Sequence, residues 1–193
     1  MARPLEHKTV GFALCGSFCT FRRILPVMRT LSEQYRLIPI LSYVAYETDT
    51  RFGKAEAFRA EIEEICNHPI LHTVPQAEPI GPKKLLDLLI IAPCTGNTLA
   101  KLAAGISDTP VTLAAKAHLR NRRPILVAVS TNDGLTGNAK NIATLLNTKE
   151  YFFVPFGQDA PTEKEASLVA NMEAIPETAA AVLEGKQIQP ILL

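Results

Sequence analysis

The segment LLDLLIIAPCTGNTLAKLAAG, residues Leu85–Gly105, is the most informative part of the sequence about the class of fold. Its first half is almost wholly apolar, which is typical of a central parallel strand covered on both faces. Pro93 is expected to end that strand, because proline cannot donate to a sheet ladder. Apolar residues then recur at helical spacing from Leu99, with Asn97 or Thr98 as the N-cap. The stretch therefore predicts a strand that leads through a polar loop into a helix, and open α/β sheets bind ligands at such loops.

The rest of the chain alternates between apolar runs of strand length and amphipathic stretches of helical spacing. Residues 43–53 and 75–82 are expected to be loops, and Thr109-Pro110 has the pattern of a helix cap followed by proline in the first turn. This alternation predicts an α/β fold, with three αβα layers around a doubly wound parallel sheet. We expect one domain, residues 1–193, on which the tail 158–193 packs. Strands are predicted at 9–14, 37–42, 70–74, 125–129 and 151–156, and helices at 21–35, 54–66, 111–120, 137–146 and 176–184.

The composition argues against several classes of protein. Lys and Arg number 20 against 19 Asp and Glu, a net charge of +1, so no basic excess favours nucleic-acid binding. No apolar run reaches the roughly 18 residues of a membrane helix, and residues 1–8 lack the apolar core of a signal peptide. The 4 cysteines include no C-x-x-C pair, so neither a metal site nor a disulfide framework is indicated. We therefore expect a cytoplasmic protein without a metal.

The segment Gly16-Ser17-Phe18-Cys19-Thr20 follows the first strand and leads into the first helix. Glycine lets the backbone approach a ligand, and the free N–H groups of a helix start attract an anion, so a phosphate is the expected ligand. The alternative is a plain strand–helix turn. The segment is not a P-loop, because Ser17 stands where the phosphate-binding lysine would be, and no G-x-G-x-x-G fingerprint is present. Ser42 ends the second strand at the same edge of the sheet and is a candidate second donor to the phosphate.

Hydroxyl and amide side chains follow both central strands, in Thr95-Gly96-Asn97-Thr98 and in Ser130-Thr131-Asn132. An amide both donates and accepts hydrogen bonds, which suits the heteroatom edge of a planar ring such as flavin. The alternative is that Asn97 and Asn132 only cap helices.

One histidine and several cations are candidates for chemistry. His72 follows an apolar run and could act as a base near neutrality, although a lone histidine is more often structural. Arg22, Arg23, Arg51 and Lys54 could bind carboxylates, and the alternative is that they simply face water.

The stretch from Ala92 to Ala103, APCTGNTLAKLA, resembles the P-A-S-A-N-T-x-A-K motif of the flavoprotein family that includes the homo-oligomeric flavin-dependent cysteine decarboxylases. Gly16-Ser17 and Ser42 match the positions at which this family holds the phosphate of FMN. The resemblance covers about residues 8–157. It implies a Rossmann-like fold, FMN as cofactor, and a homo-oligomer with FMN at subunit contacts.

Further segments of the sequence resemble one branch of that family, among them Thr48–Lys54, Ala77–Lys83 and Pro155–Asp159. Members of this branch act with a nicotinamide-binding partner protein during endospore formation. The resemblance implies oxidation of a dihydropyridine dicarboxylate to the aromatic dicarboxylate, with NAD(P) on the partner. An accessory protein that binds a nucleotide weakly, or none, and shapes its partner is the alternative.

The chain also departs from the decarboxylases. Their P-x-M-N-x-x-M-W motif corresponds here to Ser130–Gly134, which keeps the asparagine but has neither methionine nor tryptophan, so cysteine decarboxylation is disfavoured. The predicted site comprises the cofactor-binding residues Gly16, Ser17, Thr20, Ser42, Thr95, Gly96, Asn97 and Thr98, the catalytic candidates Asn132 and His72, and the substrate-binding candidates Arg51 and Lys54.

Overall fold

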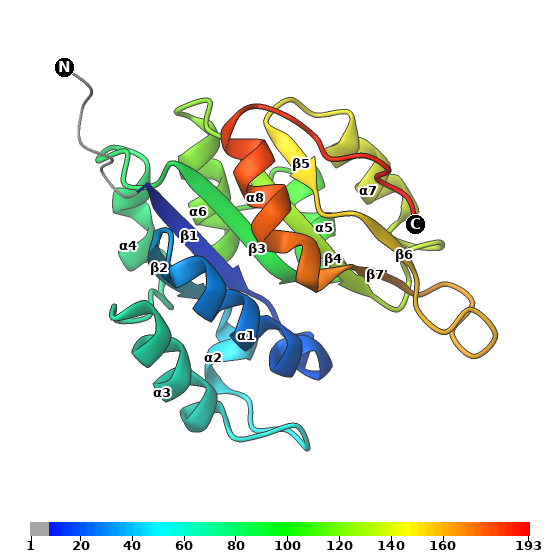
Figure 1. Ribbon diagram of the computed structural model, residues 1–193, viewed down its shortest axis with the longest axis horizontal. Coiled ribbons are helices and arrows are strands. Elements are labelled where there is room, and N and C mark those ends of the chain that lie inside the picture. The colour runs from blue at the N-terminus through cyan, green and yellow to red at the C-terminus, as the bar shows by residue number, and fades with distance from the viewer. Residues whose placement is uncertain (1–7) are drawn as a thin grey trace.

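The computed structural model describes residues 8–193, so most of the segment in which we expect no signal peptide lies outside the described residues. A seven-stranded sheet runs through the molecule in the order β2-β1-β3-β4-β7-β6, and β5 pairs with β4 off this path (Figure 1). The strands are β1 (Thr9–Leu14), β2 (Arg36–Leu41), β3 (Leu88–Cys94), β4 (Ile125–Thr131), β5 (Tyr151–Phe153), β6 (Phe156–Gln158) and β7 (Leu168–Ala170).

Helices cover both faces of this sheet. In Figure 1, α1 and α8 lie in front of the strands, and α5 and α6 lie behind them. The α-helices are α1 (Phe21–Ser32), α2 (Tyr43–Glu47), α3 (Ala55–Cys66), α4 (Val74–Ala77), α5 (Gly96–Ala103), α6 (Pro110–Leu119), α7 (Ala139–Leu146) and α8 (Ile175–Leu183). Single 3-10 turns lie at Phe18–Thr20, Glu78–Ile80 and Met172–Ala174.

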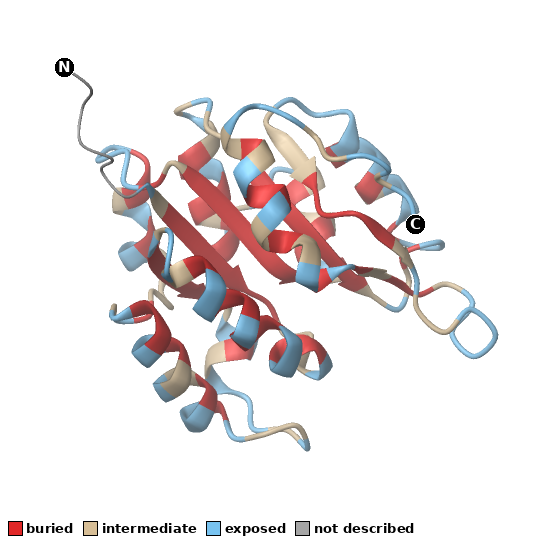
Figure 2. Cartoon of the chain, viewed as in Figure 1, coloured by how far each residue is buried: buried red, intermediate tan, exposed pale blue. Residues whose placement is uncertain are grey.

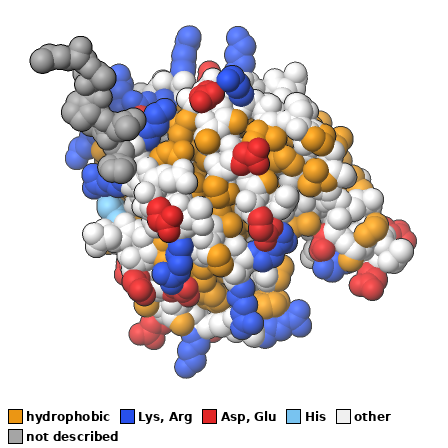
Figure 3. Space-filling view, in the orientation of Figure 1, with side chains coloured by type: hydrophobic (Ala, Val, Ile, Leu, Met, Phe, Trp, Pro, Cys, Tyr) orange, Lys and Arg blue, Asp and Glu red, His pale blue; other side chains and the backbone are white. Residues whose placement is uncertain are grey.

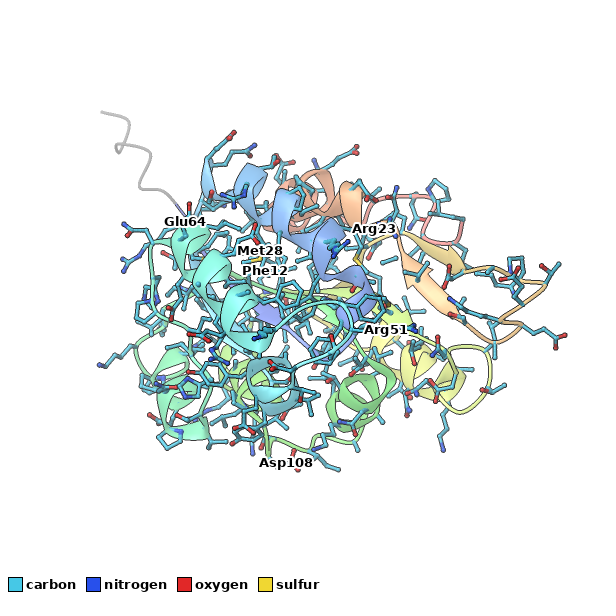
Figure 4. The ribbon with its side chains drawn as sticks, turned by 90° about the horizontal axis from the view of Figure 1, so that it is seen from below. Phe12, Arg23, Met28, Arg51, Glu64 and Asp108 are labelled. Atoms are coloured by element: carbon cyan, nitrogen blue, oxygen red, sulfur yellow. The ribbon has the colours of Figure 1, made fainter. Side chains whose placement is uncertain are left out.

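The central strands are buried because both of their faces meet helices. β3 is buried at every position, and β1 and β4 at nearly every position (Figure 2). Phe12 of β1 and Met28 of α1 lie in the core between sheet and helix, and neither is exposed to solvent (Figure 4). A continuous apolar run is what such a strand requires, which is why the sequence identified these strands.

The predicted fold class is confirmed, with an addition at one edge. β1 pairs in parallel with β2 and β3, and β4 pairs in parallel with β3 and β5. β7 pairs antiparallel with β4 and with β6, so the sheet is mostly rather than wholly parallel. The predicted strand at 151–156 is two strands, because Val154-Pro155 separates β5 from β6, and β7 was not predicted.

Pro93 does not end the central strand, contrary to our expectation. β3 continues to Cys94, and its register against β4 shifts between Ile91 and Cys94. Pro93, which has no N–H to donate, therefore lies where the regular hydrogen-bond ladder between β3 and β4 is interrupted. The carbonyl oxygen of Pro93 accepts a hydrogen bond from the N–H of Cys15, 3.2 Å away. The N-cap of α5 is Thr95, so the helix begins earlier than a cap at Asn97 or Thr98 would allow.

Two predicted loops contain helical turns, and one predicted strand is absent. Within 43–53, Ser42 caps α2, and within 75–82 the chain forms α4 and a 3-10 turn. Residues 70–74 contribute only an isolated parallel bridge between Leu71 and Ile40. Thr73 and Gln76 form a capping box there, and this favours a helix start over a strand. The predicted cap at Thr109-Pro110 is confirmed by a second capping box at the start of α6.

No helix among residues 8–193 combines the length and the hydropathy required to cross a bilayer.

Candidate functional site

A cavity of about 440 Å³ opens at the carboxyl ends of β1, β3 and β4. The chain leaves β1 toward β2 on one side and leaves β3 toward β4 on the other, so the loops after these strands diverge. In doubly wound sheets such a switch point forms the ligand crevice. The lining comprises Gly16, Ser17, Cys19, Thr20 and Arg23 after β1, Thr95 and Gly96 after β3, Ser130, Thr131 and Asn132 at the end of β4, and Asp159, Lys164, Ser167, Leu168 and Val169 from the β6–β7 region.

A hydroxyl pair joins two of these loops. Ser17 Oγ lies 2.8 Å from Ser130 Oγ, so the β1–α1 loop is tied directly to the end of β4. Thr20 Oγ1 donates to the carbonyl oxygen of Ser17, 2.7 Å away, so this hydroxyl is already engaged and serves to fix the loop. The Gly16 backbone is confined as well, since a Cβ placed there would lie 3.0 Å from Cγ1 of Val44.

The loop after β4 packs tightly against the first residue of α5. The carboxylate of Asp133 accepts hydrogen bonds from the hydroxyl of Thr131 and, at 2.8 Å, from Nδ2 of Asn138. A Cβ at Gly96 would lie within 2.8 Å of polar atoms of all three side chains, and only glycine leaves room for this approach. Asn132 lies between two anchored neighbours and is exposed at the cavity. The backbone of Asn132 is therefore held at the cavity edge by its two neighbours.

Two cations line the cavity, and each has a carboxylate partner. Arg23 donates from Nε (2.9 Å) and Nη2 (2.6 Å) to the two oxygens of Glu173. Lys164 Nζ lies 2.8 Å from Oδ2 of Asp159. The hydrogen bond to Arg23 lowers the pKa of the Glu173 carboxyl, and the hydrogen bond to Asp159 raises the pKa of Lys164.

The thiols near the cavity differ in exposure. Burial raises the pKa of Cys15 to about 11, and its sulfur accepts a hydrogen bond of 3.2 Å from Thr98 Oγ1. Burial also raises the pKa of Cys94 well above its ordinary value. Cys19 is exposed, and its sulfur lies 3.7 Å from Ser17 Oγ.

The structure thus brings together Gly16, Ser17, Thr20, Thr95, Gly96 and Asn132 from the predicted site. Two others from the same segment face elsewhere: the Thr98 hydroxyl points to Cys15 in the interior, and Asn97 is exposed but does not line the cavity.

Four further predicted residues lie outside the cavity. Ser42 caps α2, accepting from the N–H of Ala45 at 3.3 Å. His72 stacks on the ring of Tyr46 with centroids 3.8 Å apart, which is a structural contact rather than the position of a base in this cavity. The guanidinium of Arg51 lies 4.9 Å from the ring centroid of Phe52. Lys54 is the exposed N-cap residue of α3. The cations that do line the cavity are Arg23 and Lys164, of which the sequence singled out only Arg23.

Comparison with known proteins places the chain in a family. The family model described as Flavoprotein matches residues 1–184. The B subunit of dipicolinate synthase from Bacillus subtilis (strain 168) is 42% identical over 190 residues, which are 98% of this chain and 95% of that protein. The crystal structure of the dipicolinate synthase B subunit from Bacillus halodurans C is 46% identical, covers 96% of both chains and has a TM-score of 0.88.

A more distant structure shares the fold. The FMN-dependent cysteine decarboxylase SpaF has a TM-score of 0.68 at 18% identity, over 93% of this chain and 98% of that one, a likeness that concerns the fold alone. The resemblance that the central motif indicated is confirmed. From its matched residues and its 42% identical relative, the chain belongs to the flavoprotein family.

Proposed function

We propose that this chain binds FMN in the cavity and is the B subunit of a dipicolinate synthase. In that role it would act with the nicotinamide-binding A subunit of the synthase in the oxidation of dihydrodipicolinate to dipicolinate, during endospore formation. The observation that carries the proposal is the Ser17–Ser130 hydroxyl pair, 2.8 Å long, at the switch point of a flavoprotein fold. The 42% identical relative supports the choice of reaction.

The volume and the polar lining of the cavity support a phosphorylated planar heterocycle as its ligand. Its volume, about 440 Å³, lies within the roughly 300–1,000 Å³ of small-molecule sites. Gly16 and Ser17 would hold the phosphate, and Thr20 would keep Ser17 in place through its 2.7 Å hydrogen bond. Thr95, Gly96 and Asn132 would meet the ring, because they lie at the tips of the two central strands. Ser42 is not part of this proposal, because its hydroxyl caps α2.

Aromatisation of dihydrodipicolinate removes a hydride and a proton. Bound FMN would supply a hydride acceptor. The role proposed for Asn132 is to orient a ring through its amide, which donates and accepts hydrogen bonds. No histidine among residues 8–193 lines the cavity, so the proton is proposed to pass to water rather than to His72.

The test is reconstitution with and without the nicotinamide-binding partner. Dipicolinate formation and the flavin absorption bands are followed together, in wild type and in Asn132→Ala, with the exposed Asn147→Ala as the matched control. The proposal expects a yellow preparation of this chain, dipicolinate formation that requires both proteins and FMN, and a loss of about tenfold or more in rate for Asn132→Ala. A colourless chain that stimulates its partner without taking up FMN would instead support the accessory role. Release of CO₂ from a cysteine-containing peptide would support a decarboxylase.

A further inference from the structure

The cavity contains two cations, Arg23 and Lys164, to which the proposed FMN contacts at Gly16 and Ser17 give no role. Arg23 projects from α1 near its first turn (Figure 4), and Lys164 comes from the loop between β6 and β7. That loop shows acidic and basic side chains next to one another in Figure 3. Lys164, Asp159 and Arg23 all line the cavity, so two cations from distant parts of the chain face one hollow.

Each cation is held by a carboxylate of the chain itself. Glu173 receives two N–H donors from Arg23, at 2.9 and 2.6 Å, the forked geometry with which arginine recognises carboxylates. Asp159 receives Lys164 at 2.8 Å. Glu173 first, and Asp159 in addition, raise the pKa of the Arg23 guanidinium, which places Asp159 within electrostatic reach of both cations. The four groups form a connected set of two cations and two carboxylates.

These ion pairs can be exchanged for a ligand at little cost. The side chains of Arg23 and Glu173 are 45% and 59% exposed, and those of Lys164 and Asp159 are 51% and 42% exposed. Pairs this exposed contribute only about 0–1 kcal/mol, because water competes for both partners. An incoming carboxylate can therefore replace the chain's own without a large penalty. Arg51 and Lys54, by contrast, do not line the cavity.

We propose that Arg23 and Lys164 form a subsite for the two carboxylates of a small aromatic dicarboxylate, which displaces Glu173 and Asp159 from them. This inference rests on the proposed function for the identity of the ligand. The subsite would select a dicarboxylate over a monocarboxylate, because each cation takes one carboxylate.

The experiment is calorimetric titration of the full chain with pyridine-2,6-dicarboxylate and with pyridine-2-carboxylate. We expect the dicarboxylate to bind about tenfold or more tightly than the monocarboxylate, a preference that Arg23→Gln or Lys164→Gln abolishes. Arg22→Gln, which removes an exposed charge from the same helix, and Lys140→Gln are the matched controls and should keep the preference. Equal affinity of the wild type for both probes, or binding of neither, would overturn the proposal.

Substitution of the two carboxylates, Asp159 and Glu173, best distinguishes a ligand subsite from a purely structural role of the ion pairs. Asp159→Asn and Glu173→Gln each free one cation, so both are expected to tighten dicarboxylate binding by about threefold or more. If the ion pairs only hold the loop in place, losing the cation or losing the carboxylate of a pair breaks the same contact. Arg23→Gln, Lys164→Gln, Asp159→Asn and Glu173→Gln would then all weaken dicarboxylate binding. That result would refute the subsite.

Flavin titrations distinguish a failure of the dicarboxylate subsite from a failure of the proposed function. Affinities for FMN and for riboflavin are measured in the same variants. The subsite predicts both unchanged by Arg23→Gln and Lys164→Gln. A loss of FMN affinity without a loss of riboflavin affinity would assign the cations to the cofactor phosphate and overturn the inference. A wild-type chain that binds the dicarboxylate but no flavin would refute the proposed function and leave the subsite supported.

Discussion

The hydroxyls of Ser17 and Ser130 lie 2.8 Å apart although 113 positions separate them in the chain. Ser17 follows β1, Ser130 is the second-last residue of β4, and β3 lies between these two strands in the sheet. The pair therefore links the loop after β1 to the end of β4, the strands on either side of the central strand β3. Ser130 is only 7% exposed, so its hydroxyl has few other partners.

Ser17→Ala is expected to weaken FMN binding about tenfold, because a hydrogen bond to a charged phosphate contributes about 1.5–3 kcal/mol. It also leaves the Ser130 hydroxyl unpaired, so the free energy of unfolding should fall by about 1 kcal/mol. Flavin fluorescence titration and chemical denaturation measure the two effects. Ser32→Ala is the control, since the Ser32 hydroxyl donates to a carbonyl on the far end of α1 and should affect neither quantity by more than experimental error.

Gly96→Ala is expected to disrupt the loop after β4. The new Cβ would lie 2.4 Å from Asn138 Nδ2 and 2.6 Å from Thr131 Oγ1, so the loop must shift. Overpacking of this kind costs about 1–3 kcal/mol, and the displaced Asn132 should lower flavin affinity as well. Thermal unfolding and flavin titration detect the change. Gly137→Ala, which meets only Asp133 Oδ2 at 3.3 Å, is the matched control. Equal behaviour of the two variants would mean that the Gly96 contact does not position the loop.

The stability should fall as the pH drops from about 6.5 toward 4. His118 is 1% exposed, and burial lowers its pKa from 6.5 to about 4. Between these two pH values, His118 is protonated in the unfolded chain but stays neutral in the folded chain. The free energy of unfolding is therefore at its full value above pH 6.5 and decreases as the pH falls from 6.5 to about 4. The full loss is roughly 3 kcal/mol.

Denaturation at pH 7 and at pH 4.5 measures this dependence. In the native fold, Nε2 of His118 donates to the carbonyl oxygen of Pro124, 3.0 Å away. His118→Gln keeps a donor but cannot titrate, so its stability should change less between the two pH values than that of the wild type. An unchanged slope in the variant would assign the acid sensitivity to other groups.

Thiol labelling of the native chain should modify Cys19 alone. Cys15, Cys66 and Cys94 are buried, and burial raises the pKa of Cys66 to about 12, so thiolate is scarce at these positions. Because Cys19 lines the cavity, saturating FMN should slow its reaction. Mass spectrometry after brief alkylation counts the labels, and Cys19→Ser should take up none. Two or more labels on the folded chain would show that a buried thiol is reachable.

The sequence predicts the central strands because burial on both faces demands an uninterrupted apolar run, as in β1, β3 and β4. It also predicts the start of α6, because the Thr109 cap and the proline after it act locally. The register shift that admits Pro93 into β3 depends on the neighbouring strand, so no local pattern could indicate it.

The same distinction applies to the site. Gly16, Ser17 and Asn132 are predicted because each lies within three residues of the end of a recognisable strand. Lys164 and Asp159 are not, because they reach the cavity only through the antiparallel pairing of β7 with β4. The short strand β7 has just three residues and no alternation long enough to detect. Arg51 and Lys54 fit a carboxylate site by charge alone, and charge does not say which face of the fold a side chain reaches.

Titration of the flavin-free chain with FMN measures whether the cavity binds the flavin, with circular dichroism as the check that the chain is folded. We expect saturable quenching of flavin fluorescence at one FMN per chain, weakened about tenfold by Ser17→Ala. If the folded wild-type chain leaves FMN fluorescence unchanged across the titration, the cavity is not a flavin site.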